Sequence, residues 1–105
     1  MMNDSRLVDI EMMCSEPAIF EQFAEELLEF SKECLKYARK LRNENPTPRG
    51  YDEIHQSLIE EYADCKNCLE VLEFIHPHFF YEEDVESIID KKRDRWLKRL
   101  RGESE

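Results

Sequence analysis

Residues 57–75 read SLIEEYADCKNCLEVLEFI, and this stretch decides the fold. Its apolar residues recur every three or four positions, which is the period of a helix with one face toward a core. At 100° per residue, the apolar stripe of this helix consists of Ile54, Leu58, Cys65, Cys68, Leu69, Leu72 and Ile75. Glu61 falls near the centre of that stripe and Asp64 at its edge. Because burial of a lone carboxylate costs free energy, these two acids indicate a role other than packing.

The chain has the size and composition of one helical domain covering residues 1–105. Charged residues make up 38% of it and hydrophobic residues 41%. It shows neither a signal-peptide pattern nor an apolar run long enough for a membrane span, so we expect a cytoplasmic protein without a membrane partner. The four cysteines are expected to stay reduced in that compartment.

Charge is divided unevenly along the sequence. Residues 91–101, KKRDRWLKRLR, contain seven basic residues and one acid, a net charge of +6. Since the whole chain carries −10, the remaining residues carry −16. The overall acidity argues against nucleic acid as a partner. The separation of acid from base indicates a ligand that needs both signs of charge.

Capping and breaking residues divide the chain into three long helices. Ser15 or Glu16 can cap a helix whose first turn contains Pro17. Pro77 biases the residue before it away from helical geometry. The predicted long helices cover residues 16–42, 51–75 and 82–100. The other predicted segments are an N-terminal segment at 1–15, which can include a short helix, a proline and glycine loop at 43–50, and a tail at 102–105. Because no stretch alternates apolar and polar residues with period two, the predicted fold class is all-α.

The first long helix repeats the pattern of the second. Its apolar stripe consists of Ile19, Phe23, Leu27, Phe30, Cys34, Tyr37 and Leu41. Glu26 falls inside this stripe, Glu29 takes the edge position that Asp64 takes on the other helix, and Gln22 and Glu33 continue that edge. Four carboxylates meeting at a helix interface would repel one another. Hard divalent cations remove that repulsion and prefer oxygen ligands, so the pattern predicts an Mg²⁺ or Mn²⁺ site.

The last long helix has basic residues in the corresponding arrangement. Its apolar stripe consists of Val85, Ile88, Ile89, Trp96 and Leu100. Lys92 lies at the centre of the stripe, Arg99 beside it and Arg95 at its edge. A lysine stem can extend over apolar neighbours and an arginine can stack on a tryptophan ring, which is one interpretation. The other is a phosphate-binding surface.

Two acidic motifs in order resemble a known family. EELLE (25–29) followed by EYAD (61–64) is similar to the EExxE…ExxD signature of the MazG-like all-α nucleoside triphosphate pyrophosphohydrolases. The sequences LRNENPTP, LIEEYADCKNCLEVLE and KKRDRW resemble the small, phage-type members, and the resemblance covers about residues 17–101. The gap between the motifs is longer here than in most relatives. The resemblance implies a MazG-like helical bundle completed by dimerisation, as a homodimer or homotetramer.

The same resemblance implies a reaction and its residues. The expected activity converts a nucleoside triphosphate to the monophosphate and pyrophosphate, with Mg²⁺ or Mn²⁺ as cofactor. The metal ligands carried over are Glu26, Glu29, Glu61 and Asp64, with Glu25 or Glu29 as the catalytic acid that orients or deprotonates water. The implied substrate-binding residues are Lys92, Arg95 and Arg99, with Lys91 as a substitute.

Other interpretations stay open at this point. The chain could be a catalytically silent helical module that senses nucleotides or binds a protein. Cys65 and Cys68, with His76 and His78, provide four potential zinc ligands, although free cysteines on a helix stripe also pack as small apolar residues. Cys14 and Cys34 receive no role. Four aromatic residues are candidates for further core or for stacking on a base: Phe20, Phe79, Phe80 and Tyr81. The preferred base cannot be read from the sequence.

Overall fold

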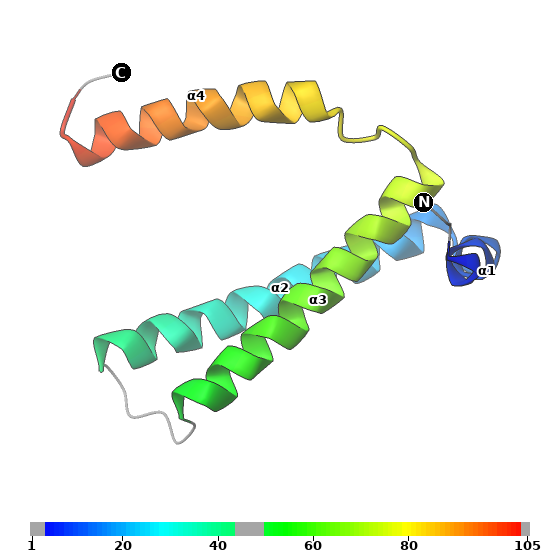
Figure 1. The fold of residues 1–105 in the computed structure, drawn as a ribbon, viewed down its shortest axis with the longest axis horizontal. Coiled ribbons are helices and arrows are strands. Elements are labelled where there is room, and N and C mark those ends of the chain that lie inside the picture. Colours follow the sequence, from blue (N-terminus) through cyan, green and yellow to red (C-terminus); the bar gives the residue numbers. More distant parts are fainter. Residues whose placement is uncertain (1–3, 44–49, 104–105) are drawn as a thin grey trace. The chain divides into compact units, whose positions relative to one another are not determined.

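The computed structural model describes residues 4–43 and 50–103, and the regular secondary structure in those ranges is all α-helical (Figure 1). This confirms the predicted fold class. The helices are α1 (Ser5–Met13), α2 (Glu16–Arg42), α3 (Tyr51–Ile75) and α4 (Glu82–Leu100). Parts of three predicted segments lie outside the described residues, namely 1–3, 44–49 and 104–105. The chain divides into two compact units, Met1–Ile75 and His76–Glu105, and the single domain expected over 1–105 stays a prediction.

Helix α2 begins and ends where its sequence signals predict. The Ser15 hydroxyl oxygen accepts a hydrogen bond from the Ala18 backbone N–H at 3.3 Å, which satisfies one donor of the first turn. Pro17 lies in that turn, where the missing N–H has no consequence. Asn43 has a left-handed conformation (φ 57°) and its N–H donates to the Arg39 and Lys40 carbonyls, which ends the helix. The predicted bounds of α2 are therefore confirmed.

Helices α2 and α3 run antiparallel and pack along their length (Figure 1). Where α3 begins, the Tyr51 hydroxyl donates to the Lys40 carbonyl at 3.1 Å and the Tyr51 ring meets Tyr37 edge-on, with centroids 6.5 Å apart. Further along, the rings of Phe30 and Tyr62 are in contact, with centroids 6.1 Å apart. These contacts fix the register between the two helices.

Ile54, near Tyr51 at the start of α3, is fully buried. A cluster of buried residues lies at the opposite end of the pair, where α1 contacts α3. It contains Ile19, Val71 and Leu72, with Leu7, Ile10, Phe20, Phe23 and Ile75 packed against it. Phe20 is thus part of the core, one of the two roles proposed for it. Val71 is buried although it falls outside the predicted stripe of α3. The reason is that α1 provides a second contact surface there, so α3 buries a wider arc of residues.

Part of the predicted stripe of α2 is exposed, which corrects the sequence analysis. Leu27 is 45% exposed and Leu41 58%, and Cys34 is also exposed. Two packed helices interlock along a narrow seam, so one partner helix cannot cover a wide apolar stripe over 27 residues. Within the first unit, α2 therefore keeps apolar surface that α3 leaves open.

The second unit is an aromatic turn followed by α4. His78 has a positive φ of 64°, and the rings of Phe79 and Phe80 meet edge-on with centroids 4.9 Å apart. Phe79, Phe80 and Tyr81 are all exposed. None of the residues of α4 is buried, so the second unit by itself does not bury the stripe predicted for that helix. Its most exposed large hydrophobic side chains are Trp96 at 61% and Leu100 at 73%.

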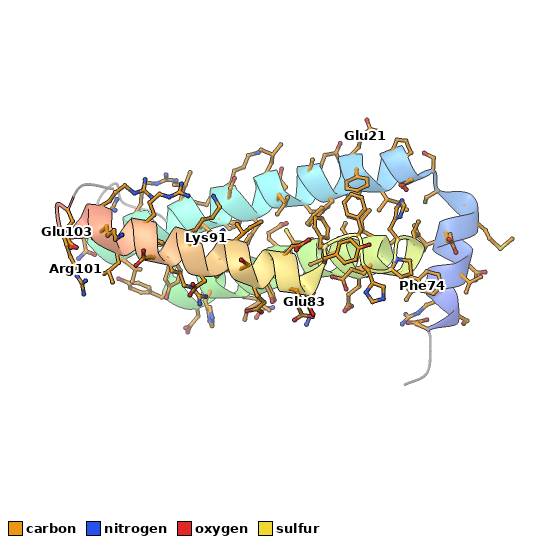
Figure 2. The ribbon with its side chains drawn as sticks, turned by 90° about the horizontal axis from the view of Figure 1, so that it is seen from above. Glu21, Phe74, Glu83, Lys91, Arg101 and Glu103 are labelled. Carbon is orange, nitrogen blue, oxygen red and sulfur yellow. The ribbon has the colours of Figure 1, made fainter. Side chains whose placement is uncertain are left out.

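Charged side chains extend from the helices into solvent, as Glu21 does from α2 (Figure 2). None of the helices in the described ranges combines the length and the apolarity that a membrane crossing requires.

Candidate metal centre

The antiparallel pairing of α2 and α3 brings three carboxylates together. Glu61 and Asp64 are three residues apart on α3 and therefore lie on one surface of that helix. Glu26 reaches the same place from α2. One oxygen from each of the three groups lies within 4.8 Å of the others, and among the described residues this is the only group of His, Cys, Asp and Glu so arranged. Glu26 and Glu61 are half-buried, whereas Asp64 is exposed.

The other two predicted acids on α2 lie outside this group. Glu29 forms an exposed ion pair with Lys32 instead, with 3.3 Å between Glu29 Oε1 and Lys32 Nζ. Glu25 is exposed on α2. The structure therefore gathers three of the four predicted metal ligands, and the roles of Glu25 and Glu29 stay predictions.

The electrostatics of the cluster are those of crowded anions. The pKa of Glu61 is raised above its ordinary value, first by partial burial and then by the negative charges of Asp64, Glu26, Glu29 and Glu33. The Glu33 carboxylate, one turn beyond Glu29, is 12% exposed and lies 3.6 Å from Lys36 Nζ. Each neighbouring charge disfavours the ionised form of Glu61. A cation at this position would reverse that effect, because it attracts the ionised form.

A glutamine holds one member of the cluster in place. Gln22 Nε2 donates a hydrogen bond to Glu26 Oε1 at 2.8 Å, across one turn of α2. This bond fixes the rotation of the Glu26 carboxylate. The sequence analysis places Gln22 on the same edge as the acids without a role. Its spacing of four residues from Glu26 could have predicted the bond, because residues four apart are neighbours on a helix.

Next to the cluster, residues of α1, α2 and α3 line a cavity of about 250 Å³ that is open to solvent on one side. Ile10, Ile19 and Val71 provide apolar walls, and Gln22 and Asn67 provide polar side chains. The lining residues are spread over three helices and do not form a motif, so no pattern in the sequence predicts the cavity.

Cys65 and Cys68 are packed between the helices, as expected for apolar residues of a stripe. Burial raises the pKa of the Cys65 thiol, and the charges of Glu26, Glu61 and Asp64 and the nearby Cys34 add to the shift. The Cys68 thiol pKa is also raised, mainly by burial. Among the described residues, the one group whose ligand atoms lie close enough to share a metal contains neither cysteine, so the geometry gives the zinc interpretation no support. In the second unit, the His76 ring contacts Phe79 and the His78 ring stacks on Tyr81.

The basic residues of α4 form a separate surface. A hollow on this helix is lined by Lys91, Asp94, Arg95 and Lys98. Of the three predicted substrate-binding residues, Arg95 lines this hollow, whereas Lys92 and Arg99 are exposed outside its lining. Asp94 Oδ2 lies 3.4 Å from Lys98 Nζ, so one positive charge of the hollow is already paired.

Comparison of the chain with protein-family models, with curated proteins and with solved structures finds no match. The functional argument therefore depends on the residues themselves.

Proposed function

We propose that the chain is an Mg²⁺- or Mn²⁺-dependent nucleoside triphosphate pyrophosphohydrolase, which converts a nucleoside triphosphate to its monophosphate and pyrophosphate. The observation that carries the proposal is the group of Glu26, Glu61 and Asp64, assembled from two helices. These acids belong to EELLE and EYAD, the two motifs that resemble the MazG-like signature.

The three carboxylates fit a hard divalent cation. Each offers an oxygen, the ligand atom that Mg²⁺ and Mn²⁺ prefer, and the three oxygens lie within 4.8 Å of one another. Gln22 orients Glu26 through one carboxylate oxygen, Oε1, and the other oxygen is not part of that bond. When bound, the cation supplies positive charge to the phosphate oxygens and makes water more acidic.

The reaction requires water to attack the α-phosphorus while the bond between that phosphorus and the bridging oxygen of pyrophosphate breaks. The attacking water must lose a proton. Glu25 directly precedes the cluster residue Glu26, and Glu29 follows it by three residues. Both carboxylates are exposed, and we assign the proton acceptor to one of them. Lys92, Arg95 and Arg99 are the proposed donors of N–H bonds to phosphate oxygens.

We further propose that two or four copies of the chain associate. The support is the apolar surface that the described helices leave exposed. On α2 and α3 it includes Leu28 at 63%, Leu35 at 59% and Ile59 at 48%. Leu28 and Leu35 are two turns apart and so lie on one side of α2, and a contiguous apolar surface is typical of a face that binds another chain. Light scattering coupled to gel filtration should give a mass of two or four chains, and a monomer at micromolar concentration would contradict this part of the proposal.

The test of the activity is pyrophosphate release from a panel of deoxynucleoside and ribonucleoside triphosphates. We expect release by the wild type with Mg²⁺ and none with EDTA. Asp64→Asn should lower the rate by about 1,000-fold, since loss of a metal ligand removes several kcal/mol of transition-state stabilisation. Asp9→Asn on α1 is the matched control and should retain activity, because Asp9 is exposed and lies outside the cluster, the cavity and the hollow on α4. If the wild type released no pyrophosphate from any of these substrates, or if Asp64→Asn were fully active, the proposed function would be wrong.

A further inference from the structure

The cavity between α1, α2 and α3 adjoins the acidic cluster through a single side chain. Gln22 lines the cavity and also donates to Glu26 Oε1 at 2.8 Å. A primary amide has two N–H donors and a carbonyl acceptor. The Gln22 side chain can therefore hold Glu26 with one N–H and bond an occupant of the cavity with the rest of the amide.

The lining of the cavity suits a planar heterocycle. Ile10, Ile19 and Val71 offer apolar surface to the faces of a ring, and the amides of Gln22 and Asn67 offer donors and acceptors to its edge. Amide side chains form such paired hydrogen bonds with the edges of bases. The polar part of the lining is accessible, since Gln22 and Asn67 are both exposed to solvent.

The volume limits what can enter. Sites for drug-sized ligands have about 300–1,000 Å³, and this cavity has about 250 Å³. The cavity therefore has room for a single base ring, and the rest of a nucleoside triphosphate would extend through its open side. The phosphates of such a ligand would have to lie outside, and the acidic cluster is the neighbouring site for a cation that binds phosphate.

We propose that the cavity takes the base ring of the nucleotide and that Gln22 is a positioning residue, which couples occupancy of the cavity to the cation site through Glu26. This inference rests on the proposed function for the identity of the ligand. A base bonded to the Gln22 amide restricts its rotation and so keeps its N–H on Glu26. The cation then binds a carboxylate that has already lost part of its freedom.

Thermodynamic linkage allows this coupling to be measured as a change in cation affinity. If base binding strengthens cation binding, the cation must strengthen base binding by the same factor. The 2′-deoxynucleosides are the appropriate probes, because they carry the base and lack the phosphates that would bind the cation directly. Mn²⁺ affinity, read by electron paramagnetic resonance of the free ion, reports the coupling without any turnover.

We expect saturating concentrations of at least one of the four common deoxynucleosides to raise the Mn²⁺ affinity of the wild type about fivefold or more, within the usual range of coupling between sites. Gln22→Met and Gln22→Ala should bind Mn²⁺ without this gain. Asn67→Leu should weaken binding of the nucleoside itself. The matched control is Gln56→Met on α3, since Gln56 makes the same bond across four residues, to Glu60 at 3.4 Å, but does not line the cavity.

Mn²⁺ affinity that no nucleoside changes, or an equal gain in both Gln22 variants, would overturn the inference. Absence of Mn²⁺ binding to the wild type would overturn it together with the cation site. Coupling in a protein that releases no pyrophosphate would support the inference as a statement about binding and would refute the proposed hydrolysis alone.

Discussion

Helices α3 and α4 have similar amphipathic patterns, but their apolar residues differ in burial. Five residues of α3 are buried, among them Leu72 at 1% exposure, because α2 and α1 pack against it. None of the residues of α4 is buried, and four of the five residues of its stripe are exposed, with only Ile89 half-buried. The comparison shows that an apolar stripe identifies a surface that needs a partner without identifying the partner.

The largest effect expected from this comparison concerns the core. Leu72→Ala should lower the free energy of unfolding by about 3 kcal/mol, because it leaves a void in a packed site. Leu97→Ala on α4, where Leu97 is 44% exposed, should change it by less than about 0.5 kcal/mol. Urea unfolding, at a concentration where sedimentation shows a monomer, checks both values. Equal effects of the two substitutions would mean that α4 is packed as tightly as α3.

A second prediction concerns the positive charge that distinguishes α4. Arg95→Ala should lower kcat/KM for pyrophosphate release about tenfold, since it removes charge-assisted hydrogen bonds to phosphate. Arg101, where α4 ends, is an exposed arginine outside the hollow that Arg95 lines, so Arg101→Ala serves as the control. If both variants kept the wild-type kcat/KM, Arg95 would have no part in substrate binding.

The two regions also differ in how their helices begin. Ser15 caps α2, whereas Tyr81 before α4 makes no side-chain cap bond. Ser15→Ala should therefore destabilise the chain by about 1 kcal/mol, which thermal unfolding followed by circular dichroism measures.

Tyr81→Ser should increase the helicity of α4, because serine can provide the missing cap bond. Amide hydrogen exchange in the first turn of α4 measures this effect. Slower exchange in that turn is expected for Tyr81→Ser, and unchanged exchange would contradict the argument.

The smallest predicted effect is a dependence on pH in the metal-free protein. The raised pKa of Glu61 means that the folded chain holds this proton more tightly than the unfolded chain. The stability from this group is therefore fully present below its ordinary pKa of 4.5 and is lost as pH rises through the raised value. In EDTA, the unfolding temperature of Glu61→Gln relative to wild type should increase with pH over that window. Glu60→Gln is the adjacent control, and a constant difference for Glu61→Gln would contradict the assigned pKa.

Helix positions and the paired acids were predictable from sequence because they follow local rules. Ser15, Pro17 and Pro77 mark helix ends by their own conformational limits, and a spacing of three places Glu61 beside Asp64 on any helix. The facing position of Glu26 required only the assumption that the two apolar stripes pack together. These parts of the prediction agree with the structure.

The remaining features depend on tertiary contacts that periodicity does not contain. Val71 is buried because α1 packs across that end of α3, and Leu27 is exposed because α3 covers only a seam of α2. On a helical projection Glu29 lies at the edge of the stripe that contains Glu26, yet its carboxylate pairs with Lys32. The cavity depends on three helices at once, so no single stretch of sequence predicts it.

The central claim is that Glu26, Glu61 and Asp64 bind a divalent cation, and anomalous diffraction from crystals grown with Mn²⁺ tests it most directly. The account predicts an anomalous peak within about 2.5 Å of a carboxylate oxygen of each of the three residues, as expected for oxygen ligands of such cations. A map with no peak among these carboxylates at saturating Mn²⁺, or with the ion held only elsewhere on the chain, would contradict it.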